Sequence, residues 1–112
     1  MSYTRLEQAL EAVLPGCVYK VQAPRQGADG KDLTRYLVWT PTGEREVSAE
    51  GAAIARIGIA VVTAATQSED DPLPQQVRAA LRAARIAVAE DVRSYDDDMA
   101  TYYVDIPVEV LL

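Results

Sequence analysis

The chain has 112 residues, enough for one domain with a modest core between two packed layers of secondary structure. It carries 17 acidic and 11 basic residues and no histidine; residues 69–112 hold the whole excess of negative charge, with ten acidic residues against four arginines. This balance argues against binding that neutralises nucleic-acid phosphates, and the missing histidine removes the commonest general base and metal ligand.

The first third of the chain predicts a helix, a strand and a polar loop. Residues 4–14 place apolar side chains at helical spacing, and Pro15-Gly16 ends the helix. A short strand follows over 17–23, and a glycine-containing polar loop over 25–32. The single cysteine, Cys17, permits no intrachain disulfide and favours a reducing compartment; we interpret it as a small buried hydrophobic residue.

The middle of the chain predicts one clear strand, followed by a segment without a clear pattern. Residues 33–40 are rich in β-forming side chains, and Pro41-Thr42-Gly43 predicts a turn after them. Residues 44–48 fit a returning strand or a polar edge. The alanine-rich residues 49–55 are ambiguous, with a short helical turn as one interpretation.

Residues 56–66 predict a buried strand with two unlike faces. One face carries larger side chains, and the other carries mostly small ones. The larger face comprises Ile57, Ile59, Val61 and Thr63, and the smaller face Gly58, Ala60, Val62 and Ala64. The small face predicts that a helix or a neighbouring chain packs closely against it.

A second helix is predicted from Pro74 to about Val88, after a start at Asp71-Pro72. Arg78, Arg82 and Arg85 recur at i, i+4 and i+7, so they share one face of such a helix. Three readings of this stripe remain open: a solvated face, a grip on phosphate or carboxylate, or a contact with acidic groups of a neighbouring subunit.

The last part of the chain predicts a short strand over 90–94, a turn at Tyr95-Asp96-Asp97-Asp98 and a final strand over 102–110. Apolar side chains alternate with more polar ones along the final strand, which indicates one buried and one wet face. Pro107 lacks an N–H, so it predicts an edge strand, or a strand exposed on one side at that point.

Two acidic clusters, Glu69-Asp70-Asp71 and Asp96-Asp97-Asp98, are candidate interaction sites. Carboxylates in a turn can bind Ca²⁺ or Mg²⁺, but the EF-hand spacing of Gly and Glu is absent, so we expect no metal. A solvated loop is one alternative. The other is a contact with the arginines of a second copy, because self-complementary charge suits a head-to-tail ring.

No catalytic constellation is recognisable in the sequence. The acidic residues lie in runs at loops, where they are solvated, and no serine stands in a nucleophile-elbow motif. Lone glycines do not make a phosphate-cradling loop. We therefore predict that the protein is not an enzyme and uses no cofactor.

Several phrases of the sequence resemble the small tail-terminator and tail-completion (head-tail joining) proteins of long-tailed bacteriophages. The first three are Leu14-Pro15-Gly16-Cys17-Val18-Tyr19, Tyr36-Leu37-Val38-Trp39 and Ile57-Gly58-Ile59-Ala60-Val61-Val62-Thr63. The others are Asp71-Pro72-Leu73, the spacing Val77-x-x-Ala80-Leu81, Tyr95-Asp96-Asp97-Asp98 and the alternating strand from Tyr102 to Val110. The resemblance spans nearly the whole chain. Related sequences often carry Thr-Gly before the last strand, where this chain has Met99-Ala100-Thr101.

The resemblance implies a single α+β domain over residues 1–112, with a mixed or antiparallel sheet of about four strands packed against two helices. The expected element order is α-β-β-(β)-β-α-(β)-β.

In function, the resemblance implies a virion protein, assembled in the bacterial host cytoplasm, that forms a homo-oligomeric ring, typically a hexamer. This ring caps the tail tube and joins it to the head, so its expected partners are other copies of itself, the tail-tube protein and the head connector or neck protein. DNA would pass through its lumen without specific binding, because an acidic surface repels phosphates. We expect no membrane partner.

Two other functions stay open at this stage. The first is a head-completion or neck adaptor protein of the same assembly. The second is a small bacterial α/β domain that binds a ligand or a regulatory partner in an apolar pocket. For the ring, the candidate interface groups are Arg78, Arg82, Arg85, Glu69, Asp70, Asp71, Asp96, Asp97 and Asp98.

Overall fold

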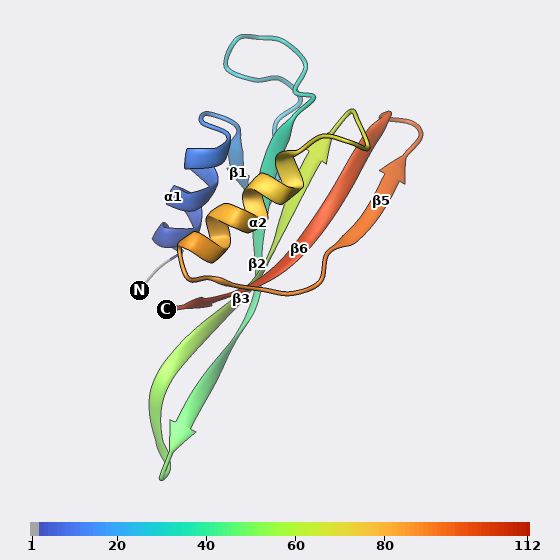
Figure 1. Ribbon diagram of the computed structural model, residues 1–112. Coiled ribbons are helices and arrows are strands. Elements are labelled where there is room, and N and C mark those ends of the chain that lie inside the picture. The colour runs from blue at the N-terminus through green and yellow to red at the C-terminus, as the bar shows by residue number, and fades with distance from the viewer. Residues whose placement is uncertain (1–2) are drawn as a thin grey trace.

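A computed structural model describes residues 3–112; the expected domain span of 1–112 thus includes two residues outside the described part. The order of elements is α1 (Thr4–Val13), β1 (Val18–Lys20), β2 (Tyr36–Ala49), β3 (Ala52–Thr66), α2 (Leu73–Ala83), β4 (Ala87–Val88), β5 (Val92–Asp96) and β6 (Thr101–Leu111). Two helices lie on a mixed sheet, which confirms the predicted α+β class (Figure 1). The sheet has six strands rather than about four.

The sheet runs in the order β1-β2-β3-β6-β4, and β5 pairs with β6 next to β4. β1 is parallel to β2, and the other pairs are antiparallel. Both helices pack on one face, where Leu6, Leu10, Leu73, Val77 and Leu81 meet the buried side chains of β2, β3 and β6. The core therefore lies between the helices and one face of the sheet.

The structure confirms that the two faces of β3 differ, as the sequence predicts. The small face is the buried one, with Ala60, Val62 and Ala64 fully buried beneath the helices. A close approach explains Gly58: a Cβ there would lie 2.8 Å from Cζ of Tyr3, whose ring also packs on Trp39. The short side chains therefore let the N-terminal helix pack tightly on the sheet.

The predicted turn at Pro41-Thr42-Gly43 is wrong, and so is the helical turn considered for residues 49–55; residues 44–48 are strand, but they do not return. Pro41-Thr42-Gly43 makes no turn; β2 continues through it as far as Ala49, with a register shift between Pro41 and Gly43. The chain turns at Glu50-Gly51, both with positive φ, and β3 already begins at Ala52. The result is one long β2–β3 hairpin, because a shift in register absorbs the proline that would otherwise interrupt the pairing.

The second helix ends five residues before the predicted Val88. Ile86 N donates to Leu81 O and Arg85 N to Arg82 O, each at 2.9 Å, while Arg85 has a φ of 60°. These bonds form a Schellman motif, with an arginine at the position that usually holds glycine. Ile86 is then buried, which offsets the strain of the left-handed residue.

The final strand is not an edge strand. β6 pairs with β3 on one side and with β4 and β5 on the other. Pro107 lies opposite the break between β4 and β5, where its carbonyl accepts a bond from Ala89 N at 2.9 Å. The missing N–H of Pro107 therefore breaks no strand pairing. This agrees with the second alternative from the sequence, a strand that is open on one side at Pro107. The alternation of β6 is confirmed: Val104, Ile106, Val108 and Val110 are buried.

Two smaller expectations also change. Cys17 is half-buried rather than buried. The turn after β5 covers residues 97–100, so Tyr95 and Asp96 still belong to the strand.

Within residues 3–112, no helix is both long and apolar enough to cross a bilayer.

Candidate subunit interfaces

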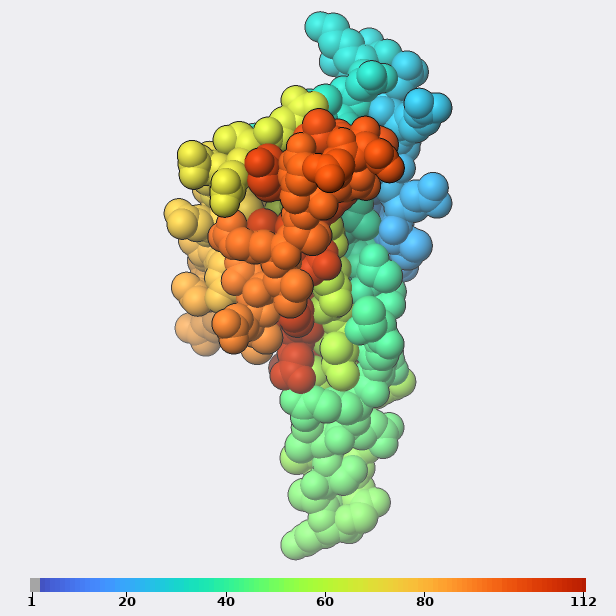
Figure 2. All heavy atoms as spheres, turned by 90° about the vertical axis from the view of Figure 1, so that its right-hand side faces the viewer, coloured from blue at the N-terminus to red at the C-terminus, as the bar shows by residue number. Residues whose placement is uncertain are grey.

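The outer part of the β2–β3 hairpin projects from the domain as a two-stranded arm, which we define as residues 43–57. Pairing with β6 begins only at Ile57, and pairing with β1 ends at Trp39. Figures 1 and 2 show the arm standing clear of the helices and the other strands, and the molecule measures 53 × 26 × 24 Å as a result. An isolated two-stranded hairpin is marginally stable in water, so an arm of this length is typical of an element that a partner completes.

The arm carries small and charged side chains around one large exposed hydrophobic residue. Ile54 is 65% exposed and lies across the register shift from the half-buried Val47, and most of the other residues near it are alanine, serine and glycine. Arg56 pairs with Glu44 across the hairpin at 2.5 Å, and Arg45 holds Glu109 of β6 at 3.1 Å. The first pair joins the two strands of the arm and the second joins the arm to the domain, and each exposed pair contributes little to stability.

The face of the sheet opposite the helices is the second candidate surface. Within residues 3–112 both helices lie on the other side, so Val38, Ile59 and Val61 are only half-buried. Polar pairs border this apolar centre: Thr63 donates to Asp105 at 2.7 Å, and burial together with a hydrogen bond to Tyr103 raises the pKa of Tyr36 to about 12. A half-covered apolar face with a polar border resembles the surface of a subunit interface.

The three arginines do not form one helical stripe. Arg78 and Arg82 lie on α2, whereas Arg85 lies beyond its end. Arg78 is half-buried and donates to Ala89 O at 3.0 Å, while Arg82 and Arg85 are exposed. The last two are therefore the arginines most accessible to a second subunit.

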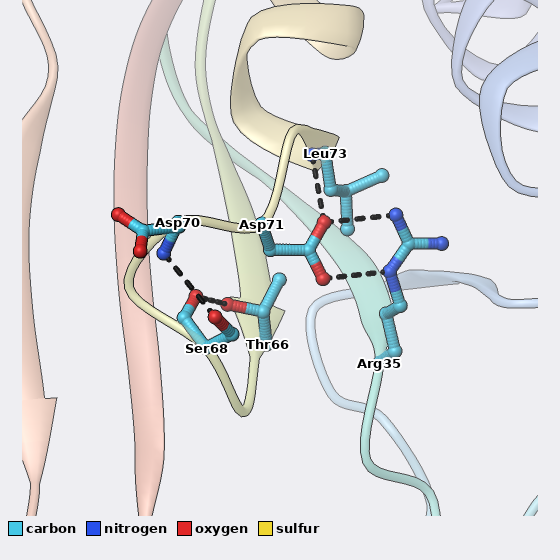
Figure 3. A network of polar contacts seen from close by, with 6 residues as sticks. All are labelled: Arg35, Thr66, Ser68, Asp70, Asp71 and Leu73. Atoms are coloured by element: carbon cyan, nitrogen blue, oxygen red, sulfur yellow. Dashed lines mark hydrogen bonds and ion pairs between the residues drawn. The ribbon is translucent and has the colours of Figure 1, made fainter.

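Asp71 has a role inside the subunit. It accepts two bonds from Arg35, both at 2.9 Å, and a third from Leu73 N at the start of α2 (Figure 3). Arg35 lowers the pKa of Asp71, with help from the Leu73 N–H and against the opposing effect of burial. The pair joins the start of α2 to the residue before β2, so the side chain of Asp71 is only 14% exposed.

We expect Asp71→Asn to lower the free energy of unfolding by about 1–2 kcal/mol at pH 7, since it removes the negative charge that faces Arg35 and weakens the hydrogen bond from Leu73 N. The folded-state pKa of Asp71 is depressed, so its contribution is complete above the unfolded pKa near 4 and disappears as the pH falls through the folded pKa. The difference between the two proteins in urea unfolding should therefore shrink steadily as the pH falls below 4. A difference that stays constant over this acidic range would contradict an electrostatic role.

The other candidate acidic residues lie in ordered turns or directly before one. Asp96 Oδ1 accepts bonds from the backbone N–H groups of Asp98 and Met99, at 3.0 and 3.3 Å, while Asp97 and Asp98 are exposed. Glu69 and Asp70 are exposed as well, and Asp70 N donates to Ser68 Oγ at 3.3 Å. In the part of the chain that the structure describes, no three acidic or cysteine side chains converge as metal ligands would.

A shallow groove of about 240 Å³ separates the loop before α2 from β5 and β6. Its walls include Pro74, Arg93, Tyr95 and Tyr102, and the two tyrosine rings pack at a tilt with their centroids 4.5 Å apart. Small-molecule sites generally exceed about 300 Å³ and enclose most of the ligand, so this open groove gives little support to a ligand-binding domain.

The arm is the feature that sequence reasoning misses. The available signal is Glu50-Gly51, a turn sequence between two β-compatible segments of nearly equal length. Of the charged residues that the sequence singles out, Asp71 is engaged within the subunit and Arg78 is half-buried, while the others lie at the surface or in turns.

No protein-family model matches the chain, and no curated protein matches it. Solved structures do: one is a chain of the "Virion of native gene transfer agent (GTA) particle". The TM-score is 0.64 and the sequence identity 15%, over 97% of this chain and 89% of that chain. This likeness shows that the two chains share a fold.

Proposed function

We propose that this protein is a structural subunit of a phage or prophage virion. In this proposal it forms a homo-oligomeric ring, of six copies by the family resemblance, that caps the tail tube and joins it to the head. The observation that carries the proposal is the β2–β3 arm, which extends beyond anything its own domain can pack against. The fold shared with a virion chain over nearly the full length supports the same conclusion.

The mechanism is geometric and needs no catalysis. A ring that covers the last ring of the tail tube blocks further tube growth, and its opposite face then offers a platform to the head connector. The excess negative charge of residues 69–112 suits such a lumen, because it repels DNA phosphates instead of holding them.

Charge holds the ring in register in this proposal. The accessible Arg82 and Arg85 of one copy lie against acidic groups of the next, for which Asp97, Asp98, Glu69 and Asp70 are available. In this proposal Arg78, which donates to Ala89 O, and Asp96 lie at the margin of the contact. Asp71 contributes indirectly, because it accepts the hydrogen bond from Leu73 N at the start of α2. One chain thus carries both halves of a head-to-tail contact.

The test is the solution mass of the purified protein by light scattering, from 50 to 500 mM salt, with negative-stain images of the largest species. We expect rings of about six subunits that loosen as salt screens the contact. Arg82→Glu should give monomers with an unchanged melting temperature, whereas Arg5→Glu on α1, with the same change in charge, should leave the ring intact. A ring that survives Arg82→Glu would exclude this face.

Mixing the protein with assembled tail tubes and with the head connector distinguishes a tail terminator from a neck adaptor. A tail terminator should bind assembled tail tubes at one end, where gold-labelled protein can be located by electron microscopy. A neck adaptor should instead bind the head connector and leave the tubes unlabelled.

A further inference from the structure

The arm has two free backbone edges, one on each side. On the β2 side, β1 pairs only with Leu37–Trp39, so β2 has no described neighbour there from residue 42 to its end. On the β3 side, β6 begins at Ile57, so residues 52–55 likewise lack a strand neighbour within the described chain. Each edge therefore presents N–H and C=O groups that another strand can use.

The composition of the arm does little to block such pairing. Natural sheets protect free edges with proline and with charged side chains, above all lysine. Residues 43–57 contain no proline and no lysine, and their outer part, residues 47–55, carries Glu50 as its one charged residue. Side chains near the tip are mostly small, so a second backbone can approach closely.

The two edges also differ in charge on one shared face. Glu44 and Glu46 lie on β2, and Arg56, the register partner of Glu46, lies on β3. Placing the β2 edge of one arm beside the β3 edge of another sets opposite charges across the new pair, which stabilises cross-strand neighbours. Pairing two β2 edges would instead set acidic residues against each other.

We propose that the arms of neighbouring copies pair edge to edge, the β2 edge of one copy against the β3 edge of the next. The inference rests on the proposed ring. Because the two edges lie on opposite sides of the arm, this contact is heterologous and repeats from copy to copy. Arms that point the same way then pair antiparallel and close into a cylinder that has no free edge.

Crosslinking between two single-cysteine variants tests this pairing. Cys17→Ser removes the native thiol; Ser48→Cys then marks the β2 edge and Ala53→Cys the β3 edge. The two positions are exposed and are register partners within one arm, so they lie at the same height. Each variant alone and an equal mixture, combined before assembly, are treated with a short bismaleimide, and light scattering follows the mass of each sample.

We expect crosslinked dimers in the mixture and several-fold fewer in either variant alone. Rings without dimers in the mixture would overturn the arm pairing but retain the ring. Dimers from Ser48→Cys alone would show symmetric pairing of β2 edges and also overturn the proposal. Monomers without crosslinks would overturn both the pairing and the ring. Melting temperatures equal to that of the parent protein confirm that each variant is folded.

Discussion

Replacing residues 46–56 with Asn-Gly is expected to give a folded monomer at concentrations where the full chain forms a ring. The replacement joins the register partners Arg45 and Ile57 by a two-residue hairpin turn, so the ion pair from Arg45 to Glu109 is retained. The deleted part contributes no side chain to the core, although the bond from Leu112 N to Arg56 O is lost, so the free energy of unfolding should change by no more than about 1–2 kcal/mol. Light scattering and thermal unfolding measure the two effects separately.

A matched shortening at the opposite end of the molecule controls for this deletion. Gln26 and Asp32 bridge the glycine-containing loop, and replacing residues 27–31 with Asn-Gly shortens it without touching the arm. This control should still form rings. If the arm-deleted protein assembles as well as the control does, the arm is not a subunit contact, and the proposed pairing fails with it.

Val62→Asp is expected to unfold the protein. Val62 is fully buried on the helix-facing side of β3, where a carboxylate would find no partner among the surrounding apolar side chains. Burying that charge costs on the order of 5 kcal/mol or more, which is comparable with the total stability of a small domain. Circular dichroism should show loss of the cooperative thermal transition.

The neighbouring Val61 provides the control on the same strand. Its side chain lies on the open face of the sheet and is half-buried, so Val61→Asp keeps access to water. We expect a loss of about 1 kcal/mol, from lower β-propensity, and a folded protein. Equal destabilisation of both variants would mean that Val61 on the open face is shielded from solvent as fully as Val62 in the core.

The periodicity of apolar residues predicts correctly the helices and strands that have one face buried in the core. The alternation of β6 and the two unlike faces of β3 follow from burial on one side of a sheet, and the structure confirms both. The first helix is predicted to within a residue, because Pro15-Gly16 marks its end. These patterns can be recognised in the sequence because each one reflects which side chains are shielded from solvent.

The sequence is less informative where the chain does not contact the core. The arm has no buried face, so its residues carry no hydrophobic alternation, and Pro41 and Gly43 imitate a turn. The end of α2 is misread for a related reason: Ala84 and Val88 continue the helical spacing, while a Schellman motif at Arg85 redirects the chain without the usual glycine.

Among the candidate interface residues, the sequence predicts acidic and basic groups at loops and on a helix, and the structure decides which of them are accessible. Arg35 engages Asp71, and Ala89 O engages Arg78. Arg82 and Asp97 remain exposed. Accessibility depends on which distant residue each side chain meets, and sequence spacing does not contain that information.

By itself, the sequence determines an α+β domain, the buried faces of β3 and β6, and an acidic second half without a catalytic constellation. Local spacing and composition suffice for these features, because they depend on burial and charge along the chain. Only the tertiary structure reveals the projecting arm with its free edges, the uncovered sheet face and the internal position of β6. These depend on which strands pair over long separations, and that pairing decides which backbone groups and apolar side chains remain for another subunit.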